Sequence, residues 1–153
     1  MKLSVIIPVF NEENTISEVI RRISSLKLVG IEKEIIVVDD GSTDSTESVI
    51  SNFQFPISNF RLIRHKKNQG KGAAVRTGIK KATGDYIIIQ DADLEYDPRD
   101  IVRLADPIRS DLTKVVYGTR LKRLPDFSRD ERNFRFLLHY LGNKFLSLVT
   151  SVL

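Results

Sequence analysis

The stretch "GDYIIIQDADLEYDP", residues 84–98, carries an apolar run that passes directly into a series of carboxylates. The run Tyr86–Ile89 has the aromatic and β-branched composition of a buried strand. Acidic side chains follow it at every second residue, at Asp91, Asp93, Glu95 and Asp97. Neighbouring carboxylates repel one another unless something compensates their charge. The stretch therefore predicts a strand that ends at an acidic site.

Similar apolar runs alternate with helical periodicity along the rest of the chain. Apolar residues recur at helical spacing at Ile16, Val19, Ile20 and Ile23. Further helices are expected at about 44–53, 71–82 and 98–108, the last starting at Pro98. Strands are expected at 3–9, 34–38, 60–64, 85–90 and 114–118. This alternation predicts an α/β fold with a central, mostly parallel sheet flanked by helices.

Composition predicts a single domain over residues 1–153. The chain is 41% hydrophobic and 29% charged, enough for a sizeable core. It contains no Cys, which excludes disulfides and Cys-bound zinc, so any metal must be held by oxygen atoms or by His. The N-terminal "MKLSVIIPVFNEE" has too short an apolar run for a signal peptide. A cytoplasmic protein is expected.

The net charge of +4 is concentrated near the C-terminus. Residues 1–112 hold 16 Lys and Arg against 17 Asp and Glu, whereas residues 113–153 hold 8 against 3. Neither a basic recognition helix nor a basic stretch interleaved with aromatic residues is present, so no nucleic-acid partner is expected. The basic excess instead favours a membrane surface or a phosphate-bearing substrate.

The acidic stretch is the candidate metal site. Spacing of two along an extended chain places Asp91, Asp93 and Glu95 on one side. Oxygen ligands favour Mg²⁺ or Mn²⁺, which often share their coordination with substrate phosphates. The alternative is a solvated acidic turn in which Asp97 caps the next helix. We interpret Asp97 as such a cap, and Asp91 and Asp93 as metal ligands.

Two other loops follow expected strands. Asp39 and Asp40 end the second strand, where a carboxylate can accept hydrogen bonds from a nucleotide base or ribose, and Asp39 is the favoured candidate. The alternative is that Asp40 or Ser42 shapes the turn, and a turn role is expected for Ser42. In "NQGKGAAVRTG", residues 68–78, backbone NH groups beside Gly70 and Gly72 are candidates for facing an anion, with tight turning and close helix packing as the alternative.

Four motifs in this order carry a resemblance to a known family: "PVFNEEN", "VVDDGSTDST", "NQGKGAAVRTG" and "QDADLEYDP". Together they resemble family 2 glycosyltransferases, which have the GT-A (Rossmann-like) nucleotide-sugar-binding fold. They are most similar to the dolichyl-phosphate mannose synthase and polyprenyl-phosphate glucosyltransferase group. The resemblance implies inverting, metal-dependent transfer of a hexose from GDP-mannose or UDP-glucose to a polyprenyl phosphate of the dolichyl type.

The resemblance also implies roles for individual residues. It places four residues around the nucleoside, namely Pro8, Phe10, Glu12 and Asp39. Asp91 and Asp93 match the DxD pair of the family. Asp91 is therefore expected to contact the nucleotide and to bind the metal, and Asp93 is expected to bind the metal and to be a catalytic residue. Glu95 matches the third metal-ligand position, which is often Gln in mannose synthases. Arg120 in "YGTR" resembles the family's acceptor-phosphate binder and is the second expected catalytic residue.

Elementary chemistry agrees with these roles. A bound cation stabilises the charge that builds on a departing diphosphate. An acceptor phosphate is already ionised and needs no general base, whereas a hydroxyl acceptor does. Arg120, with Arg132 and Arg135, is expected to hold the acceptor phosphate through charge-assisted hydrogen bonds.

The C-terminal stretch 131–153 is apolar but interrupted by charged and polar residues. It predicts an amphipathic helix lying at the cytoplasmic face of a membrane, with core packing as the alternative. Family domains usually continue beyond this point, so the resemblance implies a domain truncated at its C-terminus.

Three other functions are alternatives to a transferase acting on a lipid phosphate. A phosphoacceptor receiver domain also combines an α/β fold with clustered Asp residues, but its acidic pair follows the first strand, where this chain has "PVFNEE". A truncated domain that binds nucleotide without transferring sugar differs from the enzyme only in turnover. A related transferase acting on a polysaccharide, glycan or protein hydroxyl would need a base elsewhere in the protein.

Overall fold

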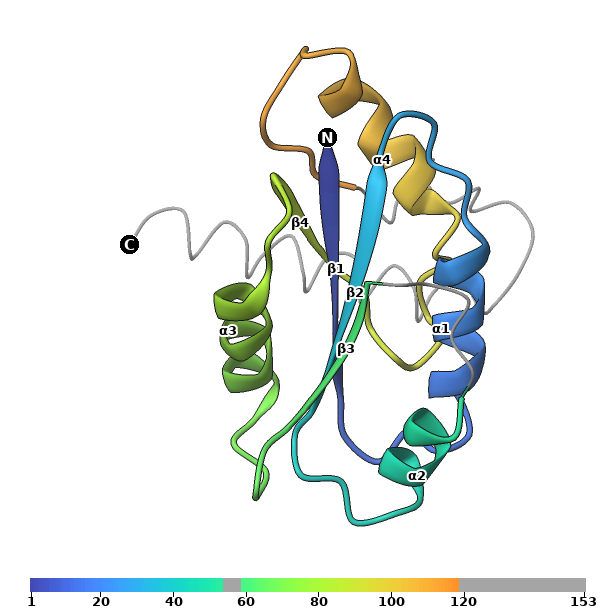
Figure 1. Cartoon of the computed structure of the whole chain (residues 1–153), viewed down its shortest axis with the longest axis vertical. Helices are drawn as coiled ribbons and strands as arrows, with labels where there is room; N and C mark the ends of the chain where they lie inside the picture. Colours follow the sequence, from blue (N-terminus) through green and yellow to red (C-terminus); the bar gives the residue numbers. More distant parts are fainter. Residues whose placement is uncertain (54–58, 119–153) are drawn as a thin grey trace, which may run out of the picture. The chain divides into compact units, whose positions relative to one another are not determined.

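The computed structural model describes residues 1–53 and 59–118. Contacts divide the chain into Met1–Val116 and Tyr117–Leu153, and only two residues of the second unit are described. The first unit contains the strands β1 (Lys2–Val9), β2 (Glu32–Asp39), β3 (Phe60–Arg64) and β4 (Tyr86–Ile89). Its helices are α1 (Ile16–Ser25), α2 (Thr46–Ser51), α3 (Lys71–Lys81) and α4 (Asp100–Arg109), shown in Figure 1.

The four strands form one parallel sheet in the order β3-β2-β1-β4. The strand β1 lies between β2 and β4, with Val9 opposite Asp39 and Ile6 opposite Ile89. Since all four strands run the same way, the loops that follow them gather at one edge of the sheet. The predicted α/β fold with a parallel sheet is confirmed.

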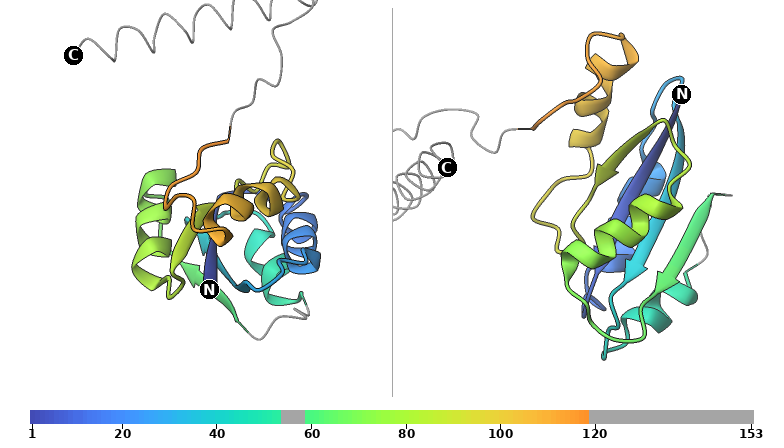
Figure 2. Two further views of the ribbon diagram at one scale, coloured as in Figure 1. Left: turned by 90° about the horizontal axis from the view of Figure 1, so that it is seen from above. Right: turned by 90° about the vertical axis from the view of Figure 1, so that its left-hand side faces the viewer.

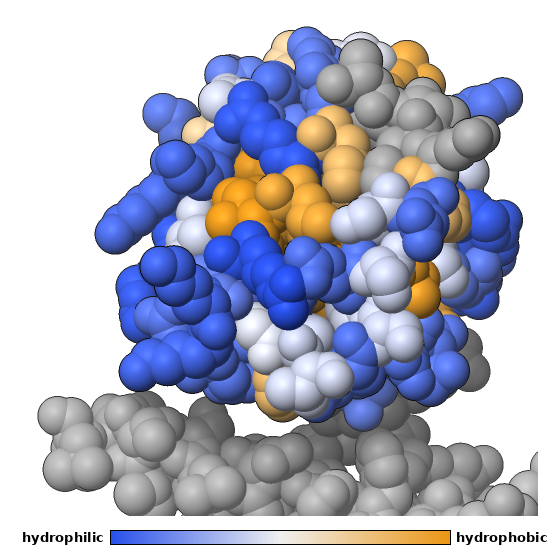
Figure 3. All heavy atoms as spheres, turned by 60° about the horizontal axis from the view of Figure 1, so that its bottom comes forward, coloured by the Kyte–Doolittle hydropathy of each residue, from blue (hydrophilic) through white to orange (hydrophobic). Residues whose placement is uncertain are grey.

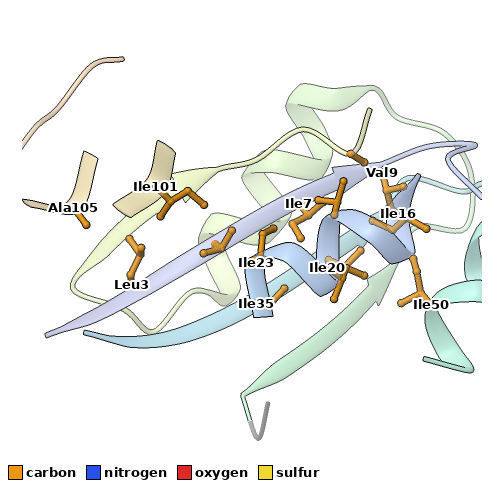
Figure 4. Packing of buried hydrophobic residues seen from close by; sticks show 14 of the residues in the cluster. Leu3, Ile7, Val9, Ile16, Ile20, Ile23, Ile35, Ile50, Ile101 and Ala105 are labelled. Carbon is orange, nitrogen blue, oxygen red and sulfur yellow. The ribbon is translucent and has the colours of Figure 1, made fainter. Parts of the chain in front are cut away.

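Helices cover both faces of this sheet. Figure 1 and the right panel of Figure 2 show α3 on one face, with α1 and α2 on the other. The predicted apolar stripe of α1 is confirmed, because Ile16, Val19, Ile20 and Ile23 are all fully buried. Figure 4 shows this stripe packed against sheet residues such as Ile7 and Ile35. On the opposite face a smaller core joins Ile36 and Val38 to α3.

Two local predictions differ from the structure. Residues 114–118 are not a strand, and Val115 and Tyr117 are exposed there. A strand requires a neighbour to pair its backbone groups, and none of the described strands pairs with this segment. The last helix starts at Asp100 instead of Pro98, and Pro98 and Arg99 form a turn before it. The Asp97 carboxylate accepts a hydrogen bond from the backbone NH of Arg99, the bond that a capping residue makes.

Among the described residues, no helix is both long enough and apolar enough to cross a membrane. The predicted amphipathic helix at 131–153 lies outside the part of the chain that the structure describes.

The α3 helix approaches the sheet closely at Gly78. This glycine is buried, and a Cβ atom added to it would overlap the Cγ2 atom of the fully buried Ile6. The first-turn glycine of the same helix, Gly72, differs, since a Cβ there would meet only an Arg76 nitrogen at 3.5 Å. The packing distance between α3 and β1 therefore depends on Gly78 having no side chain.

A buried carboxylate joins the strands at the opposite edge of the sheet. Glu34 of β2 accepts hydrogen bonds from Ser4 Oγ of β1 and from the backbone NH of Thr83, the latter at 2.6 Å. It also accepts bonds from Thr83 Oγ1 and from the Gly84 NH, and Lys2 Nζ lies 3.4 Å away. Burial raises the pKa of Glu34, but these hydrogen bonds and the Lys2 charge outweigh it and lower the pKa to about 2.

Replacing Gly78 with Ala is expected to destabilise the protein. Overpacking against Ile6 costs about 1–3 kcal/mol, which exceeds the gain of about 1 kcal/mol in helix propensity. Gly72→Ala is the matched control, because it gains propensity without the overlap. Urea unfolding of both variants measures the difference. A Gly78→Ala variant as stable as Gly72→Ala would contradict the close packing.

The Glu34 cluster predicts a pH dependence of the free energy of unfolding. Because the folded-state pKa lies below the ordinary value of 4.5, the stabilisation is fully present above pH 4.5 and is lost as the pH falls through about 2. Glu34→Gln is therefore expected to cost on the order of 2–3 kcal/mol at pH 7. More than half of this difference from the wild type should disappear by pH 3. Urea unfolding at both pH values measures it, and a pH-independent difference would rule out the charged form as its source.

Candidate functional site

The loops at the carboxyl edge of the sheet enclose a pocket of about 260 Å³. Figure 3 views the molecule from this side and shows a mostly hydrophilic surface. The pocket receives side chains from the ends of β1 and β2, the start of α3 and the loop after β4. It is lined by Pro8, Val9, Phe10, Glu12, Asp40, Asn68, Lys71, Ala74, Asp91, Ala92 and Asp93.

The first two loops are tied together by hydrogen bonds. The backbone NH of Asn11 donates to Ser42 Oγ at 3.0 Å, and the NH of Glu12 donates to Thr46 Oγ1 at 2.8 Å. Asn11 itself has a positive φ of 55°, a conformation that Asn tolerates better than most residues. These bonds fix the backbone of the segment whose side chains Phe10 and Glu12 line the pocket. The side chain of Phe10 is 42% exposed.

Asp39 is fully buried behind the pocket and is not one of its lining residues. One of its carboxylate oxygens accepts a hydrogen bond from the Ser42 NH at 2.8 Å. Among the described residues the other oxygen has no hydrogen-bond partner, although Arg64 Nε lies 3.6 Å from it. A buried acceptor that is left unpaired costs free energy, but this oxygen is fully buried and does not open into the pocket.

Asp40 holds the loop between β3 and α3. Its carboxylate accepts bonds from the backbone NH groups of Gln69 at 3.1 Å and Gly70 at 2.7 Å, and its Oδ1 lies 2.6 Å from His65 Nδ1. The other ring nitrogen of His65 lies 2.9 Å from Thr77 Oγ1. Of the backbone NH groups that are candidates for an external anion at the start of α3, Asp40 occupies the NH of Gly70, together with that of Gln69.

The same two loops touch at Gly41. Its φ is 74°, and a Cβ atom there would lie 2.7 Å from the backbone carbonyl carbon of Lys67. No other residue fits this contact without moving one of the loops. The turn that sequence analysis assigned to the "DDGS" motif therefore also serves tertiary packing.

The two carboxylates of the DxD pair both reach the pocket. Asp91 Oδ1 forms an ion pair with Lys71 Nζ at 2.7 Å. Asp93 is exposed, and its Oδ1 accepts a hydrogen bond from the backbone NH of Glu95 at 3.0 Å. Glu95 is exposed and does not line the pocket. The intervening Leu94 has a positive φ of 64°, which turns the chain sharply between the two acids.

The donor atoms suit a hard divalent cation. Asp91 and Asp93 supply only carboxylate oxygens, and the pocket has room for water or phosphate oxygens beside them. Within residues 1–53 and 59–118, no three His, Cys, Asp or Glu side chains already converge on one point. Two protein carboxylates with the remaining ligands from substrate and water is the arrangement that Mg²⁺ commonly adopts.

The pocket carries an excess of negative charge. Its lining includes four carboxylates, from Glu12, Asp40, Asp91 and Asp93, and one ammonium group, from Lys71. An anionic ligand therefore meets repulsion here unless a further cation accompanies it.

A larger groove, of about 700 Å³, lies near the amino ends of β1 and β4. Apolar side chains such as Leu3, Ile88 and Ile101 dominate its lining. It does not bring several carboxylates together, so the carboxyl edge remains the candidate site.

The structure brings together five of the seven predicted site residues that it describes, and Asp39 and Glu95 do not line the pocket. The five that line it are Pro8, Phe10, Glu12, Asp91 and Asp93. Asn68 was missed, although an Asn two residues before a glycine is typical of a turn, and its Oδ1 accepts a bond from the Gly70 NH. The predicted acceptor-binding residues lie outside the described residues, and they are Arg120, Arg132 and Arg135.

Comparison with known proteins agrees with this geometry. A protein-family model described as "Glycosyl transferase family 2" matches residues 4–152. The chain therefore belongs to glycosyltransferase family 2, as the resemblance of its motifs indicated.

Two curated relatives act on lipid phosphates according to their names. The chain is 40% identical over 120 residues to an undecaprenyl-phosphate 4-deoxy-4-formamido-L-arabinose transferase of Enterobacter sp. (strain 638), covering 77% of this chain and 36% of the relative. It is 35% identical over 136 residues to a dolichol-phosphate mannosyltransferase of Pyrococcus furiosus, covering 84% and 38%. The chain thus spans little more than a third of these relatives.

A solved structure supports the fold. A mannosyltransferase from Pyrobaculum calidifontis, in complex with GDP-Man and Mn²⁺, superposes with a TM-score of 0.57 at 32% sequence identity. The match covers 69% of this chain and 32% of that protein. The predicted GT-A fold is confirmed.

Asp40→Asn is expected to loosen the loop before α3. The amide nitrogen of Asn cannot accept a hydrogen bond, so one of the backbone NH groups of Gln69 and Gly70 loses its partner at a cost of about 1–3 kcal/mol. Native-state hydrogen exchange should become faster at these two amides. The exposed Asp106→Asn is the control and should stay within about 0.5 kcal/mol of the wild type. Unchanged exchange at Gly70 would contradict the role of Asp40.

Proposed function

We propose that this chain binds the donor in an inverting, metal-dependent glycosyltransferase that moves a hexose from GDP-mannose or UDP-glucose to a polyprenyl phosphate. The observation that carries the proposal is one pocket in which Asp91 and Asp93 share the lining with Phe10 and Glu12. The names of the curated relatives and the GDP-Man and Mn²⁺ of the solved mannosyltransferase support it.

The nucleoside would lie against the wall formed by Pro8, Phe10 and Glu12. The exposed ring of Phe10 offers an aromatic face to a base. Asp39 is buried and does not line the pocket, so a local shift of the surrounding loops would have to expose its unpaired oxygen before it accepts a hydrogen bond from a base NH or a ribose hydroxyl.

Asp91 and Asp93 would hold Mg²⁺ or Mn²⁺ between the protein and the diphosphate, with Glu95 as the third protein ligand. Bound there, the cation supplies Lewis-acid stabilisation of the negative charge on the leaving diphosphate. The net negative charge of the pocket is the physical reason for metal dependence, since a diphosphate alone would be repelled.

Arg120, Arg132 and Arg135 would bind the acceptor phosphate, which is ionised and needs no base. Attack on the anomeric carbon from the side opposite the diphosphate inverts its configuration. A peripheral site at the cytoplasmic face of a membrane, with residues 131–153 lying on the lipid, would bring the enzyme to such an acceptor. In this proposal Asp93 and Arg120 are the catalytic residues that touch the reacting groups or the metal between them.

The test is calorimetric titration of the chain with GDP-mannose and with UDP-glucose, each with Mn²⁺ and with chelator. We expect one donor to bind only when the metal is present. Asp91→Asn and Asp93→Asn should each abolish this binding, because each removes a charged ligand of the cation, while far-ultraviolet circular dichroism stays unchanged. Asp106→Asn is the control for a charge change far from the pocket.

Retained affinity in both DxD variants would rule out the metal assignment. Failure of the wild-type chain to bind either donor would contradict the proposed function of this chain.

A further inference from the structure

The ion pair between Lys71 and Asp91 spans the pocket from α3 to the loop after β4. Lys71 Nζ lies 2.7 Å from Asp91 Oδ1, and both residues line the pocket. The ammonium group is therefore in direct contact with the carboxylate that the proposed function assigns to a divalent cation.

The two cations exclude each other at this position. A metal bound to Asp91 Oδ1 would stand within a few ångströms of the Lys71 ammonium, and like charges at that distance repel strongly. A divalent ion also carries twice the charge of the ammonium it replaces. A metal that binds Asp91 through Oδ1 thus requires Lys71 to leave this oxygen, and one that binds through the other oxygen is weakened by the nearby ammonium charge.

The backbone around Lys71 is held while its side chain is free to move. Lys71 is the first residue of α3 and follows Gly70, whose NH donates to Asp40 at 2.7 Å. Its side chain is 62% exposed, against 22% for Asp91. A lysine side chain is a long, flexible stem with a compact charge, so the ammonium can shift by several ångströms without any backbone change.

We propose that Lys71 is a built-in counter-ion that competes with the divalent cation for Asp91 and, once displaced, binds the diphosphate of the donor. This inference rests on the proposed function and names a further residue of that site. Among the described lining residues Lys71 carries the one ammonium group, and an incoming diphosphate offers it a new charge-assisted partner. Metal and donor then favour each other's binding, since the metal frees the group that the donor uses.

The test compares the wild type with Lys71→Met, which keeps the length of the side chain and removes its charge. Lys67→Met is the matched control, because Lys67 is an exposed lysine of the same loop that does not line the pocket. Mn²⁺ binding without nucleotide is measured by electron paramagnetic resonance. GDP and UDP binding at saturating Mn²⁺ is then measured by calorimetry.

We expect opposite effects in Lys71→Met. Mn²⁺ alone should bind about two- to fivefold more tightly, as expected from loss of a competing, partly exposed ion pair. The nucleoside diphosphate at saturating Mn²⁺ should bind roughly tenfold or more weakly, because a charge-assisted contact is lost. Lys67→Met should change neither value.

Each other outcome overturns a stated part of the proposal. Unchanged or weaker Mn²⁺ binding in Lys71→Met overturns the competition for Asp91. Unchanged nucleotide binding overturns the contact with the diphosphate. Failure of the wild type to bind Mn²⁺ or either nucleotide overturns the proposed function, and this inference with it.

Discussion

Parallel pairing of β1 with β2 and β4 is the constraint on which the rest of this structure depends. It aligns Val9 with Asp39 and Ile6 with Ile89, so the loops after these strands leave the sheet at the same edge. Residues separated by most of the domain, such as Phe10 and Asp93, thereby line one pocket. Burial of the α1 stripe stabilises this pairing from one face, and the close approach at Gly78 stabilises it from the other.

The amino and carboxyl ends of the strands differ in how their carboxylates are paired. At the amino edge, Glu34 is surrounded by donors from Ser4 and Thr83, which stabilise its ionised form within the fold. At the carboxyl edge, the described pocket lining holds four carboxylates and one ammonium, which pairs with Asp91, and an oxygen of the buried Asp39 has no hydrogen-bond partner among the described residues. Carboxylates with hydrogen-bond partners in the protein stabilise the fold, and ligand binding is expected where carboxylates lack such partners.

Asp40 lines the pocket, but its carboxylate is used to hold the loop before α3. Its carboxylate takes the backbone NH groups of Gln69 and Gly70, which would otherwise be available to an anion at the start of α3. In the proposed function, Lys71 and a cation held by Asp91 then supply the positive charge for an anion in this pocket. The position of Lys71 in turn depends on the loop that Asp40 and Gly41 hold in place.

The sequence by itself determined the strand and helix order, the buried stripe of α1 and the acidic end of β4, because burial and periodicity are local patterns. The resemblance of the motifs identified the family, and it also predicted five of the residues that line the pocket. Only the tertiary structure decided that Asp40 holds the β3–α3 loop, that Asp39 lies behind the pocket, and that residues 114–118 form no strand. Such contacts join groups 20 or more residues apart, as in Lys71 with Asp91, and local patterns carry no information on which distant loops will meet.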